Sequence, residues 1–356
     1  MFLWHRLQTE SRPILIYGMG NGAEKILSLS QEYGITISGI FASNDHARTV
    51  EFRGYRVMSY DEALEKYTDA VILIAFGVYQ EDVLRRIEAL GELYTILVPD
   101  LPLMGGEILT PETVEKSHDS INAARSLFSD DKSRLVFDAM LEVKLTGDLS
   151  AHFREDTPRE ADMKLLGLSD REHYLDLGAY NGDTIREFLK LTEGKYASID
   201  AFEPDAHNYR KLSEFTQSIS NVTLHPYASW DRETTLIFSG KGGRNCAMKP
   251  DLPGQYKHLH EVTAIPVDSL NSDFTYVKMD VEGAEAETLK GMKQLLCRCH
   301  PKLLISCYHK PDDFITLPLL LEALFPGYRM YLRRNRCLPA WEIQLYCVYP
   351  ENDQDS

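Results

Sequence analysis

The sequence has few cysteines, and none has a spacing typical of a metal site or a disulfide framework. Six cysteines occur in 356 residues, and none of them forms a Cys-x-x-Cys pair. Cys297 and Cys299 are separated by one residue, which is a poor spacing for two ligands of one zinc ion. Free cysteines are often buried, and cytoplasmic thiols stay reduced. We therefore expect reduced, mostly buried thiols in a cytoplasmic protein.

Long apolar runs and an excess of positive charge are also absent. The longest clean apolar run, Val71–Val78, is far shorter than the roughly 20 residues of a membrane-spanning helix. The N-terminal segment Met1–Arg6 lacks the apolar stretch of a signal peptide. Lys and Arg number 38 against 54 Asp and Glu, a net charge of −16. A field of this sign repels phosphate backbones and anionic lipids, so we expect neither a nucleic-acid partner nor a membrane span.

The chain instead contains two blocks in which predicted strands and helices alternate. An apolar content of 44% fits ordinary globular domains. We predict a Rossmann-like α/β domain over residues 1–105, a helical linker of one or two helices over 106–165, and a larger α/β domain over 166–356. In the first domain the predicted strands are Pro13–Tyr17, Ile35–Ala42, Val71–Ala75 and Tyr94–Val98.

The second domain is predicted to be an open parallel sheet closed by an antiparallel hairpin. Apolar runs alternate with helical segments, but the last two runs have no helix between them. Residues 231–268, which include Gly240–Gly243, break this rhythm and are expected to form an inserted hairpin and loop. The predicted strands are His173–Gly178, Ala197–Glu203, Val222–Tyr227, Phe274–Asp280, Lys302–Tyr308, Tyr328–Arg333 and Glu342–Tyr349.

A glycine-containing turn after the first of these strands is the strongest functional signal. In Tyr174–Thr184 an apolar strand delivers Asp176, and Gly178 and Gly182 flank a tight turn into a helix. Glycine lets the backbone approach a ligand closely, and the helix N-terminus offers free N–H groups. The turn lacks one glycine of the nicotinamide dinucleotide pattern. Its acidic residue, Asp176, suits a cationic amine better than a phosphate.

Further acidic residues follow strands that end at the same edge of the predicted sheet. Glu203 ends the second strand, where a carboxylate can accept both hydroxyls of a ribose. Asp280 ends the fourth strand and Glu282 follows it, so two carboxylates repel each other unless a cation or proton is present. Glu285 lies in the first turn of the next helix, where we expect it to stabilise the helix dipole.

A histidine follows the fifth strand, beside these carboxylates. Adjacent strands lie about 4.8 Å apart, so we expect His309 to converge with Asp280 and Glu282. His309 is then a general base oriented by a carboxylate, or all three residues hold a divalent cation. We favour the base, because no further oxygen ligands of a magnesium site can be located in the sequence. A structural role is the third interpretation: Asp280 positions cofactor or backbone, and His309 caps the strand end.

In this order, the four motifs resemble the FkbM family of S-adenosylmethionine-dependent methyltransferases. The resemblance covers about residues 130–349 and includes Leu175–Thr184, Phe202–Asp205, Val277–Glu285 and Tyr308–His309. It implies a class I methyltransferase fold whose seventh strand is antiparallel, and O-methylation of sugars or natural products. It also implies that Glu203 holds the ribose of the cofactor. The cofactor-binding residues that it implies are Asp176, Gly178, Ala179, Tyr180, Asn181, Gly182, Asp183, Thr184, Glu203, Pro204, Ala228 and Ser229, the last two beside the adenine.

The first domain carries a weaker glycine motif, Gly18-x-Gly20-x-x-Ala23. No acidic residue ends its second strand cleanly, and the nearest polar cluster is Ser43–Asp45. Over about 90 residues the domain resembles nucleotide- or sugar-recognition domains of polysaccharide-modifying enzymes. It equally fits a domain that binds no cofactor and serves interdomain packing or partner contact.

The sequence therefore predicts a methyltransferase that uses S-adenosylmethionine to methylate a hydroxyl of a sugar, glycan precursor or natural product, as in polysaccharide biosynthesis. Two alternatives remain: an NAD-dependent oxidoreductase that uses the first glycine motif, and a non-catalytic binding protein with a degenerate methyltransferase domain. The missing acid in the first domain opposes the oxidoreductase, and the intact set of Asp176, Gly178, Gly182 and Glu203 opposes degeneracy. We expect a small-molecule or glycan acceptor. A divalent metal is possible but not favoured.

Overall fold

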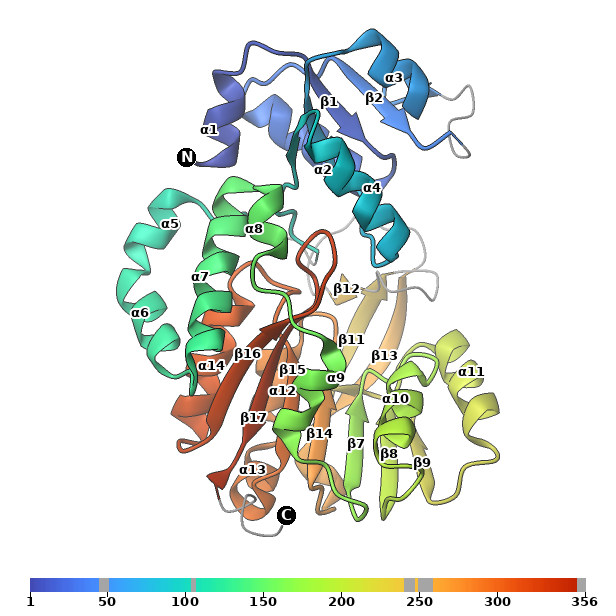
Figure 1. Ribbon diagram of the computed structural model, residues 1–356. Coiled ribbons are helices and arrows are strands. Elements are labelled where there is room, and N and C mark those ends of the chain that lie inside the picture. Colours follow the sequence, from blue (N-terminus) through green and yellow to red (C-terminus); the bar gives the residue numbers. More distant parts are fainter. Residues whose placement is uncertain (45–50, 104–106, 240–246, 249–258, 351–356) are drawn as a thin grey trace.

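A computed structural model shows two α/β units, one above the other, joined by a group of helices (Figure 1). It describes residues 1–44, 51–103, 107–239, 247–248 and 259–350. The Gly240–Gly243 loop and Asp45, both noted in the sequence, lie outside these residues. Two larger sheets consist mainly of parallel strands, which confirms the predicted α/β class.

The N-terminal unit has a six-stranded sheet in the order β3-β4-β2-β1-β5-β6, in which only β3 is antiparallel to its neighbour. β1 and β5 are buried along their whole length, which explains their uninterrupted apolar sequences. The hairpin β3–β4 was not predicted, because β3 has two residues and β4 has only two buried ones. The elements are α1 Leu3–Gln8, β1 Ile14–Tyr17, α2 Asn21–Glu32, β2 Gly39–Ala42, β3 Glu51–Phe52, β4 Tyr55–Ser59, α3 Tyr60–Lys66, β5 Val71–Ile74, α4 Glu81–Gly91 and β6 Thr95–Leu97.

Five helices and a 3₁₀ turn follow, where the sequence analysis expected one or two helices. That number was wrong because polar caps divide the segment. The side chains of Thr110, Asp130 and Asp148 each accept a hydrogen bond from a backbone N–H of the following turn. Gly147 ends the longest helix in a left-handed conformation, with φ +62°. The elements are α5 Pro111–Lys116, α6 His118–Ser126, α7 Asp131–Thr146, α8 Leu149–Phe153, α9 Arg159–Asp162 and η1 Met163–Leu166.

The second unit has a seven-stranded sheet in the order β16-β17-β15-β14-β7-β8-β9. β17 is antiparallel to β15 and β16, and the other neighbours are parallel, so the predicted parallel sheet with a terminal hairpin is confirmed. A separate sheet, β10-β13-β11-β12, contains the described part of the insertion. The elements are β7 His173–Leu177, α10 Asp183–Leu191, β8 Ser198–Phe202, α11 Ala206–Thr216, β9 Val222–His225, β10 Ala228–Ser229, β11 Thr234–Ser239, β12 Ala247–Met248, β13 Leu259–Ile265, η2 Val267–Leu270, β14 Tyr276–Met279, α12 Glu285–Lys290, α13 Lys293–Cys299, β15 Lys302–Ser306, α14 Asp313–Leu324, β16 Arg329–Arg334 and β17 Ile343–Val348.

Helices cover both faces of this sheet, because successive side chains of each strand point to opposite faces. On β7, Leu175 and Leu177 belong to a core that includes residues of α7, α12 and α14. Tyr174 belongs to a second core, with residues of η1 and α10. The central strands are therefore apolar on both faces, which makes them visible in the sequence.

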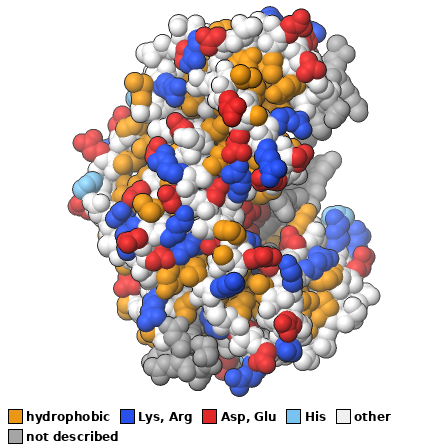
Figure 2. Space-filling view, in the orientation of Figure 1, with side chains coloured by type: hydrophobic (Ala, Val, Ile, Leu, Met, Phe, Trp, Pro, Cys, Tyr) orange, Lys and Arg blue, Asp and Glu red, His pale blue; other side chains and the backbone are white. Residues whose placement is uncertain are grey.

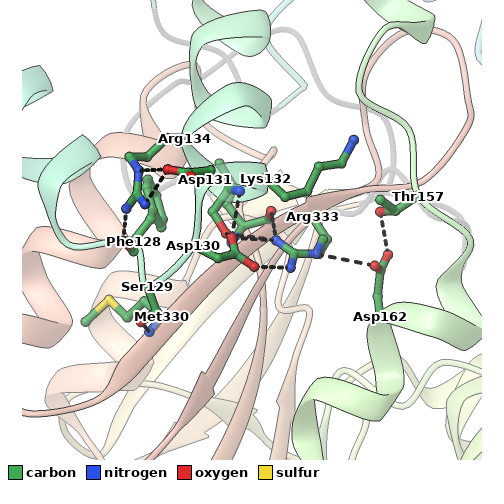
Figure 3. Close-up of polar contacts among 12 residues, drawn as sticks. Phe128, Ser129, Asp130, Asp131, Lys132, Arg134, Thr157, Asp162, Met330 and Arg333 are labelled. Atoms are coloured by element: carbon green, nitrogen blue, oxygen red, sulfur yellow. Dashed lines mark hydrogen bonds and ion pairs between the residues drawn. The ribbon is translucent and has the colours of Figure 1, made fainter.

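Arg333, on β16, fixes the helical segment to this sheet (Figure 3). Its guanidinium lies 2.5 Å from Asp130, the cap residue of α7, and 3.5 Å from Asp162 at the end of α9. The hydroxyl of Thr157 donates to Asp162 at 2.8 Å. Arg333 and Asp162 expose only 8% and 3% of their side chains, so this ion pair is largely shielded from water.

The N-terminal unit is held to the second sheet by the loop between β16 and β17. Val78 and Leu338 exchange two backbone hydrogen bonds, of 2.7 and 3.0 Å. Trp341 packs directly on Gly77, where a Cβ atom would lie 2.3 Å from the indole ring. In Figure 1 the arrow of β1 points down and that of β7 points up toward this junction. The carboxyl edges of the two sheets therefore face each other.

Two expectations from composition bear on the described residues. No helix among them is both long and apolar enough to cross a membrane. Their five cysteines are free, and Cys307, Cys337 and Cys347 are buried. The expected unpaired and mostly buried thiols are confirmed for this part of the chain.

Candidate active site

The glycine turn connects β7 to α10 at the carboxyl edge of the second sheet. Gly178 has φ +83°, and a Cβ atom there would lie 1.9 Å from the backbone oxygen of Asp280. Glycine is required because the ends of β7 and β14 approach so closely. The N–H groups of Gly178 and Ala179 donate to the carbonyl oxygen of Phe202 at 3.1 and 2.9 Å. These bonds hold the turn beside the end of β8.

A buried ion pair supports the turn. Asp176 is fully buried, lies 3.4 Å from Lys278 Nζ, and accepts a hydrogen bond from the hydroxyl of Thr184. Lys278 also donates to the carbonyl oxygen of Gly178 at 3.1 Å. Burial opposes the charge on Lys278, but the carboxylates of Asp176, Asp280 and Asp183 together outweigh it and raise the pKa of Lys278. Asp176 thus holds the turn from within the protein, whereas Lys278 reaches the cavity described below.

Glu203 follows β8, and its carboxylate lies against the turn. Its oxygens accept hydrogen bonds from the backbone N–H groups of Tyr180, at 2.9 Å, and Asp205, at 2.8 Å. Tyr180 has φ +48°, a left-handed conformation uncommon outside glycine. Burial raises the pKa of Glu203 to about 7, although these two bonds oppose the shift. Each carboxylate oxygen retains acceptor capacity for a ligand hydroxyl.

A cavity of about 860 Å³ lies at the carboxyl edges of the two sheets, and Figure 2 shows the surface hollowed where the two units meet. Its volume is within the usual range for small-molecule sites. The predicted cofactor residues that line it are Gly178, Tyr180, Asp183, Thr184, Glu203, Pro204, Ala228 and Ser229. The others, which are not part of its lining, are Asp176, Ala179, Asn181 and Gly182.

Four charged side chains meet beyond the ends of β14 and β15. His309 Nε2 lies 3.3 Å from Asp280 Oδ1 and 3.7 Å from Glu282 Oε2. On the other side of the ring, Nδ1 lies 2.8 Å from Glu285 Oε1. The hydroxyl of Tyr308 donates to Asp280 at 3.4 Å. The structure thus brings together Asp280, Glu282 and His309, and it adds Glu285, which the sequence analysis had assigned to the helix dipole.

The burial of this cluster determines its charge. His309 and Glu285 expose only 2% and 1% of their side chains, whereas Asp280 and Glu282 expose 30% and 29% and line the cavity. Burial opposes a charged ring, but the three carboxylates outweigh it and raise the pKa of His309 to about 10. Burial raises the pKa of Glu282 to about 8, against the pull of His309. At neutral pH the ring is therefore an imidazolium, and Glu282 is the group poised to titrate.

This geometry fits a proton-sharing cluster, and three of its residues could also hold a metal ion. One potential ligand atom each of Asp280, Glu285 and His309 lies within 4.8 Å of the others. A metal, however, requires a neutral ring nitrogen. Both nitrogens of His309 face carboxylates, and without a metal ion the raised pKa of the ring favours the cation.

Several residues of the site were not among the predicted ones. Lys278 carried a usable signal, because a lysine in a strand buried on both faces is rare without a partner. Tyr308 was noted only as a neighbour of His309. Asn208, on α11, is 4% exposed, and its Oδ1 has no hydrogen-bond partner although the residue lines the cavity. Nothing in its sequence context distinguished it from an ordinary helix residue.

The strand order and the glycine turn at the carboxyl edge define a class I methyltransferase fold. Residues 176–337 match the family model of the methyltransferase FkbM domain. Over these residues the chain is similar to the methyltransferase FkbM domain, which confirms the resemblance found in the sequence. Methyl transfer from S-adenosylmethionine is the chemistry of this family.

One solved structure extends the likeness in fold to almost the whole chain. A methyltransferase FkbM from Methylobacillus flagellatus KT is 20% identical, with 95% of this chain and 90% of that chain covered and a TM-score of 0.70. An rRNA methylase from Streptococcus thermophilus is 13% identical, with 55% and 97% covered and a TM-score of 0.35. Fibrillarin from Aeropyrum pernix, solved with S-adenosyl-L-methionine, is 14% identical, with 53% and 74% covered and a TM-score of 0.34. No curated protein matches the chain.

Proposed function

We propose that the protein transfers a methyl group from S-adenosylmethionine to a hydroxyl of a sugar, glycan precursor or natural product. The observation that carries this proposal is the cluster of Asp280, Glu282 and His309 on the wall of the cavity that Glu203 also lines. A hydroxyl must lose its proton as its oxygen attacks a methyl group. The cluster supplies a carboxylate to receive that proton.

The residues of the cavity fit this cofactor. Glu203 is a buried carboxylate with acceptor capacity for ribose hydroxyls. Asn208 Oδ1, a buried acceptor without a partner, suits an amino group such as that of adenine. Asp183 and Asp280 add negative charge to the same wall, which suits a cationic amine and sulfonium. When bound, the cofactor supplies an electrophilic methyl group.

We assign the proton-accepting role to Glu282 rather than to His309. The sequence analysis favoured His309, but an imidazolium has no free lone pair to receive a proton. Glu282 reaches the cavity, and its pKa of about 8 lies close to neutral pH, where a general base is most effective. His309 pairs with Glu282 and Asp280 from the buried side, and Glu285 balances the charge of the ring.

Calorimetry on the full chain tests the proposal against its two alternatives. We expect S-adenosylhomocysteine to bind and NADH not to bind. Binding of NADH without S-adenosylhomocysteine would revive the oxidoreductase. A degenerate binding protein would bind neither, or would bind S-adenosylhomocysteine without transferring the label of [methyl-³H]-S-adenosylmethionine to any hydroxyl compound.

A further inference from the structure

The cavity takes its walls from both α/β units. Met19 and Gly22 reach it from the end of β1, and Ala75–Gly77 from the end of β5. Gly178 and Asp280 reach it from the second sheet. In open α/β sheets ligands bind outside the carboxyl ends of the strands. Here two such edges face each other (Figure 1), and one cavity takes lining residues from both units.

Two glycines of the turn from β1 into α2 have a packing explanation. A Cβ atom at Gly22 would lie 2.0 Å from the carbonyl oxygen of Ala75, so this position must be glycine for α2 to pack against the end of β5. A Cβ atom at Gly18 would lie 2.7 Å from the ring of Phe76. Packing thus accounts for Gly18 and Gly22 without a dinucleotide, whereas at Gly20, with φ +101°, no atom of the described residues other than its chain neighbours lies within 4 Å of a Cβ position.

Three aromatic side chains reach the cavity from the interface between the units: Phe76, Tyr79 and Trp341. Packing holds two of them in place. The ring of Phe76 meets Tyr17 edge-on with centroids 4.9 Å apart, and Trp341 lies against Gly77. Tyr79 exposes 41% of its surface. The wall thus presents aromatic surface that is largely preorganised.

Hydrogen-bonding groups line the same cavity as these rings. Asn335, Glu342 and Gln344 come from the β16–β17 hairpin, and Asp280 and Glu282 from the cluster. A pyranose matches this combination. The C–H groups on one face of a pyranose are apolar and carry slight positive charge, which suits the negative face of an aromatic ring. Its hydroxyls need the carboxylate and amide groups at the rim.

We propose that the N-terminal unit is the acceptor-binding half of the active site, and that Phe76, Tyr79 and Trp341 hold the pyranose ring of a saccharide acceptor. This inference rests on the proposed function and narrows its acceptor to a saccharide. The ring has two possible sources, a glycan or a nucleoside-diphosphate sugar. Both share the pyranose that the aromatic side chains bind.

The test uses the full chain, [methyl-³H]-S-adenosylmethionine, and two panels of probes: methyl glycosides and uridine or guanosine diphosphate sugars. We expect at least one pyranoside to be labelled. Trp341→Ala and, separately, Tyr79→Ala should raise the KM for that acceptor at least tenfold and leave the Kd for S-adenosylhomocysteine within twofold. Trp341→Phe should restore most of the loss. Tyr55→Ala, an aromatic change in the same unit outside the cavity, is the matched control.

Each outcome decides one point. Labelling of the glycosides identifies a glycan-type acceptor, and labelling of the diphosphate sugars alone identifies an activated sugar; both support the proposal. Labelling of non-saccharide compounds only, or no binding of any saccharide while S-adenosylhomocysteine binds, overturns it. An unchanged KM in both alanine variants also overturns it. If S-adenosylhomocysteine itself does not bind, the proposed function fails first.

Discussion

Glu282 combines a left-handed backbone conformation, a raised pKa and a position on the cavity wall. Its φ of +54° is left-handed, and Gly283 follows with φ +93°. A left-handed non-glycine residue costs on the order of 1 kcal/mol, and such strain is concentrated at functional sites. The carboxylate of Glu285 accepts a hydrogen bond from Val281 N–H at 3.1 Å and pairs with His309. One buried acid thus supports both the strained turn and the imidazolium behind Glu282.

The pH dependence of turnover is the first prediction. We expect kcat to rise with an apparent pKa near 8 as Glu282 loses its proton, and to fall near 10 as His309 loses its charge. Glu282→Gln should lower kcat by roughly 10²–10⁴ and abolish the rising limb. The profile is measured with saturating donor, and the Kd for S-adenosylhomocysteine should change little.

Glu287→Gln is the matched control, because Glu287 lies on α12 but not on the cavity wall. Its pH profile should equal that of the unmodified chain. A Glu282→Gln variant that retains the rising limb would assign the proton to another group and contradict our mechanism.

Cofactor affinity should depend on the ionisation of Glu203. Its pKa of about 7 is raised, and a ribose hydroxyl donates to the carboxylate rather than to the acid. We therefore expect full affinity well above pH 7 and a decline as the pH falls through that value. Glu203→Gln loses charge-assisted bonds worth about 1.5–3 kcal/mol, at least tenfold in Kd. Calorimetry with S-adenosylhomocysteine from pH 5.5 to 8.5 tests both points. If Glu203→Gln binds with the same affinity and the same pH dependence as the unmodified chain, Glu203 does not belong to the site.

Part of the site could be predicted at the scale of residues, because its side chains follow the ends of predicted strands. Asp280 and His309 follow apolar runs, and parallel strands bring their carboxyl ends to one edge. The charge of His309 was not predictable, because it depends on Glu285, the first residue of α12, lying 2.8 Å away. Asn208 was missed for a similar reason: only tertiary packing reveals its unpaired oxygen.

At the scale of elements, the ion pairs of Arg333 hold α7 and α9 against β16 (Figure 3). We predict that Arg333→Met lowers the free energy of unfolding by about 3 kcal/mol, since it leaves Asp162 buried without its cation. Arg85→Met, which breaks an exposed pair with Glu81 on α4, should cost less than about 1 kcal/mol. Urea unfolding compares the two, and equal costs would show that Arg333 contributes no more than a surface pair.

Some helices and strands could be predicted from the sequence, and others could not. Central strands such as β5 and β14 were found because both of their faces are buried. The helical segment was predicted with too few helices, because its boundaries depend on cap bonds such as that of Asp130. Asp130 also binds Arg333, which is remote in sequence, so local patterns did not contain this information.

At the scale of the whole molecule, the two sheets form one active site only while their carboxyl edges stay together. Besides the backbone hydrogen bonds of Val78 and Leu338, Trp341 packs on Gly77 there, and Arg336 pairs with Glu88 at 2.7 Å. Arg336 and Glu88 expose 32% and 38% of their side chains. Such pairs contribute about 0.2–1 kcal/mol, whereas overpacking a tight contact costs about 1–3 kcal/mol. Packing should therefore dominate the interface.

This comparison leads to a prediction about two variants. Gly77→Ala places a Cβ atom 2.3 Å from the ring of Trp341, so the indole must move. We expect faster hydrogen exchange in α4 and a raised KM for the acceptor. Glu88→Ala removes only the exposed ion pair and should leave both nearly unchanged. Neither variant touches the wall formed by Glu203, so the Kd for S-adenosylhomocysteine should stay constant in both. Faster exchange in Glu88→Ala than in Gly77→Ala would show that charge, and not packing, joins the two units.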